Sequence, residues 1–145
     1  MVIARNPRRG NLKKRDCFAP LAMTKNKSMR VELTRFKVKK GKSKRVDDWM
    51  KMLKRNMPAV KRSLKDEKMY VETIFREFNG NDEYLYWYSI QGGGGIPIKQ
   101  SKHEIDKKHL EFWKECMDKK SKNYYKDMKT ELVLIPERIK KNMKG

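Results

Sequence analysis

The spacing of apolar residues between Val31 and Ile135 constrains the fold more than any other feature of this sequence. The spacing alternates between a period of two, typical of strands, and a period of three to four, typical of helices. It predicts strands at about 30–39, 69–77, 83–91 and 128–135, with helices at about 44–64 and 101–119. The order is therefore strand, helix, strand, strand, helix, strand. In 145 residues this predicts one α+β domain of ferredoxin-like β-α-β-β-α-β topology, a four-stranded antiparallel sheet with two helices on one face.

Local signals refine this prediction. The run Asn79-Gly80-Asn81-Asp82 predicts a tight hairpin, because Asn-Gly accommodates positive φ angles. Pro58 lies inside the first helical pattern, so we expect a kink or a split there. The last predicted strand contains the continuous apolar run 132–135, which is typical of a strand covered on both sides.

The third predicted strand is bulky on both faces. Tyr84, Tyr86, Tyr88 and Ile90 share one face, and Leu85 and Trp87 share the other. Two helices can cover only one face, so the second face needs a different cover. A second copy packed sheet against sheet would give a dimeric α+β barrel. The alternative is that 121–127 and the tail after Pro136 fold over this face.

Residues 1–28 differ in character from the rest of the chain. They hold eight Lys or Arg and one Asp, with no periodic apolar pattern. We expect a disordered basic segment, and a true start at Met23 or Met29 is an open alternative. The predicted domain covers 29–139, and 140–145 form a short basic tail.

The formal net charge of +20 raises the possibility of a nucleic-acid partner. After residue 28, however, the basic residues are mostly lysine, with seven arginines. Base readout favours arginine, and lysine excess also arises from composition bias. We therefore expect at most weak, non-specific binding to nucleic acid through Lys51, Lys54 and Lys61.

Other features limit the remaining classes. No apolar run approaches the ~20 residues that span a bilayer, so no membrane partner is expected. Cys17 and Cys116 lie in very different contexts, which argues against a disulfide and favours a cytoplasmic protein. The sequence contains no CxxC or HExxH motif, and it indicates no metal or cofactor.

Two groups of residues are candidates for chemistry. The first is His109, with Asp106 one helical turn away and Cys116 two turns away. The structural alternative is a packed core histidine that is hydrogen-bonded to a neighbour. The second group would form a polar pocket with aromatic walls between sheet and helices, or else a structural ion pair with solvated edge residues. It comprises Glu32, Arg35, Glu72, Tyr86 and Tyr88.

The core also resembles a bacterial family of unknown function, domain of unknown function 6176. The matching stretches include VELTRFKVKKGKSKRVDDWMKML, DEKMYVETIFREF, EYLYWYSIQG, HEIDKKHLEFWKEC and MKTELVLIPERI. This resemblance implies a dimeric ferredoxin-like α+β barrel and brings no established activity. The architecture is more distantly similar to antibiotic-biosynthesis and haem-degrading monooxygenases, which use a histidine and a tryptophan around a buried ligand. Trp87 and either His109 or His103 occupy comparable elements.

Three functional hypotheses remain open. The first is a dimeric barrel that binds a small molecule through the polar group above together with Trp87 and His109. The second is a monooxygenase- or isomerase-like enzyme with His109, Arg35 and Tyr86 as catalytic candidates. The third is the weak nucleic-acid association. Whether any reaction is catalysed stays undecided at this level.

Overall fold

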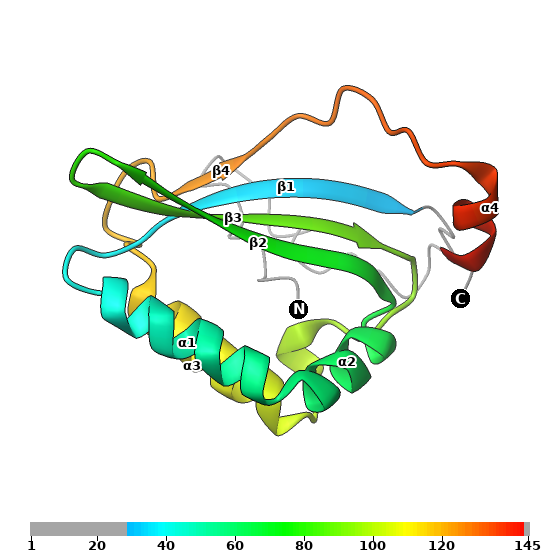
Figure 1. The fold of residues 1–145 in the computed structure, drawn as a ribbon, viewed down its shortest axis with the longest axis horizontal. Helices are drawn as coiled ribbons and strands as arrows, with labels where there is room; N and C mark the ends of the chain where they lie inside the picture. The colour runs from blue at the N-terminus through cyan, green and yellow to red at the C-terminus, as the bar shows by residue number, and fades with distance from the viewer. Residues whose placement is uncertain (1–28, 144–145) are drawn as a thin grey trace, which may run out of the picture.

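The computed structural model describes residues 29–143 as a four-stranded antiparallel sheet with helices packed on one face (Figure 1). The α+β class and the four-stranded antiparallel sheet are therefore confirmed. The predicted N-terminal segment 1–28 and the last two residues of the predicted tail 140–145 lie outside the described residues. The elements are β1 (Arg30–Lys37), α1 (Ser43–Arg55), α2 (Met57–Asp66), β2 (Met69–Asn79), β3 (Asp82–Gln91), α3 (Glu104–Cys116), β4 (Tyr125–Asp127) and α4 (Glu137–Lys140), with 3₁₀ turns at Ile98–Gln100 and Lys141–Met143.

The strands lie in the order β2-β3-β1-β4, and each neighbouring pair is antiparallel. The β2–β3 hairpin closes at the predicted turn, where Asn79 pairs with Asp82 and Gly80 has a φ of 60°. β1 and β2 are consecutive in the chain but are not neighbours in the sheet. The connection between them contains α1 and α2 and leads from the inner strand β1 to the edge strand β2.

Pro58 splits the first predicted helix, as expected. α1 ends at Arg55, and α2 begins at Met57 with the proline in its first turn. A proline is tolerated there because the first N–H groups of a helix have no intrahelical acceptor. No helix within residues 29–143 combines the length and apolarity needed to cross a membrane.

The predicted fourth strand at 128–135 is wrong. The observed strand β4 covers only Tyr125–Asp127, and the chain after it makes two hydrogen bonds to β1, from the Met128 N–H and from the Thr130 hydroxyl. Leu132 and Leu134 are 73% and 81% exposed. The apolar run 132–135 is not covered by any described part of the single chain, and it does not extend the hydrogen-bonded pairing of β4 with β1. Figure 1 shows it arching away from the edge of β1 towards α4.

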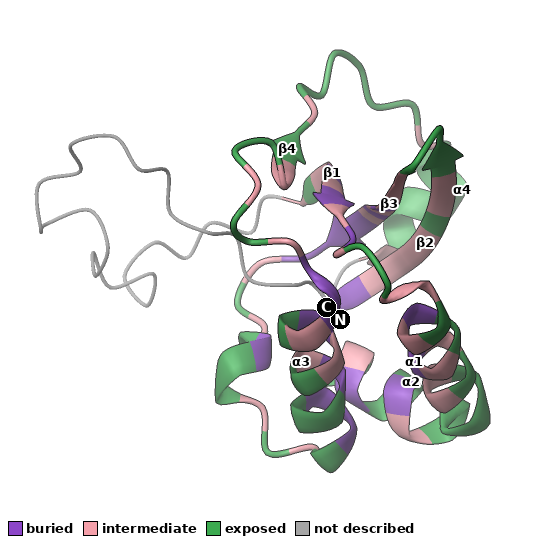
Figure 2. Cartoon of the chain, turned by 90° about the vertical axis from the view of Figure 1, so that its left-hand side faces the viewer, coloured by how far each residue is buried: buried purple, intermediate pink, exposed green. Residues whose placement is uncertain are grey.

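The apolar core lies between the sheet and the pair α1 and α3 (Figure 2). The Phe36 ring meets Trp87 and Trp113 edge to face, with centroids 6.2 Å and 5.9 Å away. Arg76 of β2 binds Glu83 within the hairpin and connects the hairpin to the start of α1 through Asp47 and Ser43. The buried apolar residues of this core are Phe36, Val38, Val46, Trp49, Leu85, Trp87, Trp113, Cys116 and Met117.

A glycine-rich loop, residues 92–96, joins β3 to the segment before α3 and packs on the junction of α2 and β2. The Gly92 N–H donates to the Lys68 carbonyl, and the Ile96 N–H donates to the Asp66 carbonyl. A Cβ on Gly95 would lie 2.1 Å from the Glu67 carbonyl oxygen. Only glycine therefore allows the loop to approach this close to the backbone at Glu67.

Candidate functional site

The sheet divides the predicted site residues between its two faces. Along β1, Thr34 and Phe36 are buried on the helix side, so Arg35 between them lies on the other face. The same alternation in β3 places Trp87 on the helix side, where it contacts Trp49 of α1. The helix side thus receives Glu32, Glu72, Trp87 and His109, and the open face receives Arg35, Tyr86 and Tyr88.

The open face carries a small polar group among aromatic rings. The Tyr86 hydroxyl donates to Glu77 Oε2 at 2.6 Å, and this bond raises the pKa of the tyrosine. The Arg35 guanidinium lies 4.6 Å from the Tyr84 ring centroid, and its buried Nε has no hydrogen-bond partner among the described residues. Phe75, in the neighbouring strand, is 56% exposed. This face is therefore largely apolar and incompletely covered in the single chain.

His109 is fully buried on the helix side. The Trp49 indole N–H donates to its Nδ1 at 3.1 Å, and its Nε2 has no hydrogen-bond partner among the described residues. Burial holds the pKa of this imidazole well below its usual value. The ring is thus neutral, and because Nδ1 accepts, the proton is on Nε2. His109 presents a buried N–H donor there.

Aromatic rings join His109 to the sheet. Its ring centroid lies 5.2 Å from that of Trp49 and 5.6 Å from that of Trp87. The Trp87 indole N–H in turn donates to Glu72 Oε1 at 2.7 Å. The structure therefore brings together His109, Trp87 and Glu72, three of the predicted residues. Trp49 completes the group, and it was not among the predicted site residues.

A second chain of polar contacts lies between α2 and α3. The Ser63 Oγ is 2.6 and 2.5 Å from the two Asp106 oxygens and 3.1 Å from Glu67 Oε1. All three residues are at most 2% exposed. One hydroxyl has one proton to donate, so it cannot donate to both carboxylates. Asp106 was considered from the sequence, but Ser63 and Glu67 were missed. Their spacing of four residues could have indicated that the two polar side chains lie on the same side of a helix.

The helix face of the sheet is polar opposite these residues. Glu72 and Glu32 both pair in register with buried Ser89, one from each side, which forms a row across three strands. In the next row, Gln91 donates to the Glu67 carbonyl and accepts from Arg30. We call this set the interior polar cluster: Glu32, Ser63, Glu67, Glu72, Ser89, Gln91, Asp106 and His109.

Other predicted residues lie apart from this cluster. Cys116 is buried in the apolar core, and burial raises the pKa of its thiol to about 11, so it is not a reactive thiolate. His103 contacts Asp66 at 2.6 Å in a half-exposed position. Lys51, Lys54 and Lys61 are exposed on α1 and α2, and their weak binding to nucleic acid stays a prediction.

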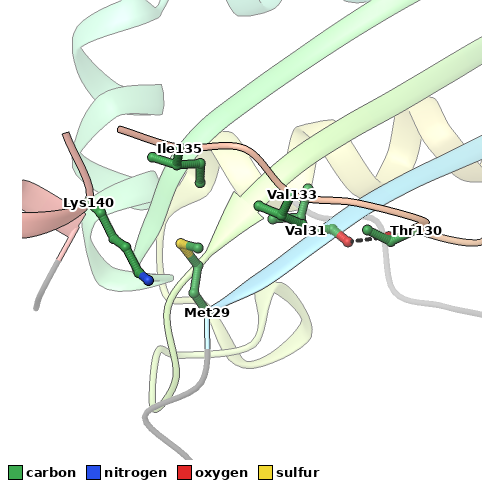
Figure 3. Close-up of a pocket in the computed structure, with 6 residues that line it drawn as sticks. All are labelled: Met29, Val31, Thr130, Val133, Ile135 and Lys140. Atoms are coloured by element: carbon green, nitrogen blue, oxygen red, sulfur yellow. Dashed lines mark hydrogen bonds between the residues drawn. The ribbon is translucent and has the colours of Figure 1, made fainter. Parts of the chain in front are cut away.

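A separate hollow of about 380 Å³ lies where the start of β1 meets the chain after β4. Figure 3 shows its lining, with Met29 and Val31 facing Val133 and Ile135, and Lys140 at one side. Most of its lining residues are apolar, and none belongs to the interior polar cluster. Within residues 29–143, no group of three or more His, Cys, Asp or Glu side chains is arranged to hold a metal ion.

Acidification should destabilise the protein through His109. Its folded pKa is depressed, so below about pH 6.5 the unfolded chain binds a proton that the folded chain does not, and stability falls. Between pH 7.5 and 5.5 this contributes a loss of about 1.4 kcal/mol. The free energy of unfolding in urea should be measured at both pH values for the wild type and for His109→Gln. Its decrease on acidification should be smaller in the variant by this amount. Parallel pH dependence in the two proteins would contradict the assignment.

Comparison with known proteins identifies a family without an assigned activity. The model of the Family of unknown function (DUF6176) matches residues 29–141. No curated protein and no solved structure matches the chain significantly. The matched residues include every strand and helix described above.

Proposed function

The chain belongs to the Family of unknown function (DUF6176), and we propose that it is a small dimeric α+β barrel protein that binds a small molecule between its sheet and its helices. The interior polar cluster is the observation that carries this proposal. Of the seven buried polar side chains among the described residues, six belong to it. Burial of polar groups costs free energy unless each is well hydrogen-bonded, and a domain this small gains little from it structurally.

The contacts within the cluster support a binding role over a purely structural one. A structural ion pair would place a basic side chain against Asp106, but the contacts of this carboxylate are with the Ser63 hydroxyl. The His109 Nε2 donor has no acceptor among residues 29–143. A bound molecule would satisfy groups that the described chain leaves incomplete.

The geometry favours a binding role for His109 over that of a general base. With Nδ1 occupied by the Trp49 N–H, the neutral ring can donate from Nε2 but cannot accept there. Arg35 and Tyr86, the other catalytic candidates, lie on the opposite face of the sheet in the same chain. We therefore propose Trp87, Glu72 and His109 as ligand-binding residues and assign no reaction to them.

The barrel and the dimer are part of the same proposal. The strand order β2-β3-β1-β4, with antiparallel neighbours and helices on one side, supports a ferredoxin-like topology. Phe75 and the row of tyrosines leave an apolar sheet face that the described chain does not cover. Packing of this face on a second copy would bury it and leave the helix-side cluster of each chain intact.

Native mass spectrometry of the protein purified from its own host tests the binding role. We expect a mass larger than that of the denatured chain, and its loss in His109→Leu. Met117→Leu is the matched control, since it changes a buried residue of the apolar core at nearly constant volume and should retain the ligand. A wild-type protein with no retained mass, which also shows no binding to small-molecule probes, would contradict the proposed function.

A further inference from the structure

We infer that residues 129–135, which we call the apolar arm, bind a second copy of this chain. In the dimer, the arm of each copy packs its outer side chains on the aromatic open face of the other copy. This inference rests on the sheet-to-sheet dimer of the proposed function, and it extends that dimer because it adds a second contact surface to each chain.

The arm is attached to its own chain only near its start. The Met128 N–H donates to the Leu33 carbonyl at 2.9 Å, and the Thr130 hydroxyl donates to the Val31 carbonyl at 3.0 Å. Among residues 29–143, no backbone group of 129–135 is hydrogen-bonded to another backbone group. The arm therefore presents an unpaired backbone, which is a feature that another chain can bind.

The side chains of the arm alternate between two sides, as in a strand. Val133 and Ile135 face the start of β1, where they line the hollow described above (Figure 3). Leu132 and Leu134 do not line it, and they are 73% and 81% exposed, compared with 41% for Val133. The arm thus has an inner side that contacts its own strand and an outer side of two leucines that no described part of the chain covers.

The arm lies on the same side of the sheet as the open face. Figures 1 and 2 both show it on the side opposite α1 and α3. Val31, which lines the hollow together with the arm, shares one face of β1 with Arg35. A second copy that covers the open face therefore also reaches the outer side of the arm, so the two uncovered surfaces form one interface.

The charges at these surfaces suit a contact between identical chains. Two chains that each carry a formal net charge of +20 repel one another unless they meet where the local charge is low. Residues 132–135 carry no charge. On the open face, Lys37 pairs with Asp82 at 3.1 Å, and the Tyr86 hydroxyl interacts with both Glu77 and Arg35. Opposite charges are therefore balanced beside the rings.

Two-fold symmetry doubles the contact. In an isologous dimer the arm of one copy meets the open face of the other, and the reverse contact occurs at the same time. The open face offers rings along two neighbouring strands, so the leucines of an arm meet an aromatic surface. These rings belong to Phe75, Tyr84, Tyr86 and Tyr88.

Isotope-filtered nuclear Overhauser spectroscopy on a mixture of labelled and unlabelled chains tests the inference, because it detects only contacts between copies. The methyl groups of Leu132 and Leu134 in the labelled chain should show cross-peaks to aromatic protons of the unlabelled chain. Cross-peaks found only within a labelled chain, whether to its own open face or to residues 1–28, would overturn the inference.

Sedimentation velocity of Leu134→Asp gives a second test. The new carboxylate would be buried at the interface without a partner, so the dissociation constant of the dimer should rise at least about 100-fold. The side chain is 81% exposed in the single chain, so circular dichroism should show an unchanged fold. Ile96→Asp is the matched control. Ile96 is 47% exposed in the glycine-rich loop on the α2–β2 junction, and this variant should remain dimeric.

The outcomes separate this inference from the proposed dimer. If Phe75→Asp dissociates the dimer and Leu134→Asp does not, the arm contact is wrong and the sheet-to-sheet packing stands. If the wild-type chain is a monomer at every concentration, both are wrong.

Discussion

Replacement of Gly95 with alanine should destabilise the protein by about 3 kcal/mol or more, which corresponds to a fall in Tm of about 10 °C. The added Cβ would lie 2.1 Å from the carbonyl oxygen of Glu67 and 2.4 Å from its carbonyl carbon. These are backbone atoms at the junction of α2 and β2, so a side-chain rotation cannot relieve the clash. Thermal unfolding followed by circular dichroism measures the effect.

Gly94→Ala is the matched control for this substitution. Gly94 has a φ of 78°, but a Cβ added there would meet no atom within 4 Å, so the cost is limited to backbone strain of about 1–2 kcal/mol. A Gly95→Ala variant as stable as Gly94→Ala would show that the loop does not pack on Glu67. Displacement of the loop should also disturb Glu67 and with it the interior polar cluster.

Phe75→Asp should convert the proposed dimer to a monomer. Phe75 lies in β2 on the open face and is 56% exposed, so its replacement costs the single chain little. In a sheet-to-sheet dimer the new carboxylate would be buried without a partner, which should weaken association at least about 100-fold. Tyr86→Asp should act in the same direction, but it also removes the hydrogen bond to Glu77. Sedimentation velocity over a range of concentrations measures the change.

Met57→Asp provides the control for the dimer prediction. Met57 is an exposed apolar residue in the first turn of α2, on the helix side of the sheet, where a carboxylate suits the helix terminus. This variant should remain dimeric. A wild-type chain that sediments as a well-folded monomer would defeat the sheet-to-sheet arrangement, as would an unchanged dimer in Phe75→Asp.

Local signals in the sequence predicted the elements that depend on local chemistry. The Asn-Gly turn placed the β2–β3 hairpin correctly, and Pro58 placed the break between α1 and α2. The fourth strand failed because an apolar run reports a preference for burial but not the presence of a cover. In the single chain the run at 132–135 lies beyond the three-residue strand β4 and stays largely exposed.

The candidate site could be predicted only in part. His109 was identified by its position on the second predicted helix, Glu72 by its position in an apolar strand, and Trp87 through the resemblance to the monooxygenases. Arg35 was grouped with Glu32, but an odd spacing of three residues puts two side chains on opposite faces of a regular strand. The link between Ser63 and Asp106 spans 43 residues, and only the packing of α2 against α3 brings them together.

The central position of β1 also has a consequence for synthesis of the chain. Arg30 pairs with Gln91, which is 61 residues further along, whereas the β2–β3 hairpin closes through a turn of two residues. At about 5–20 residues per second, β1 waits roughly 3–12 s after it is made before its partner β3 exists. During that interval Leu33 and Phe36 are apolar groups on an unpaired strand. We therefore expect the nascent chain to be most prone to aggregation before the hairpin is complete and can pair with β1.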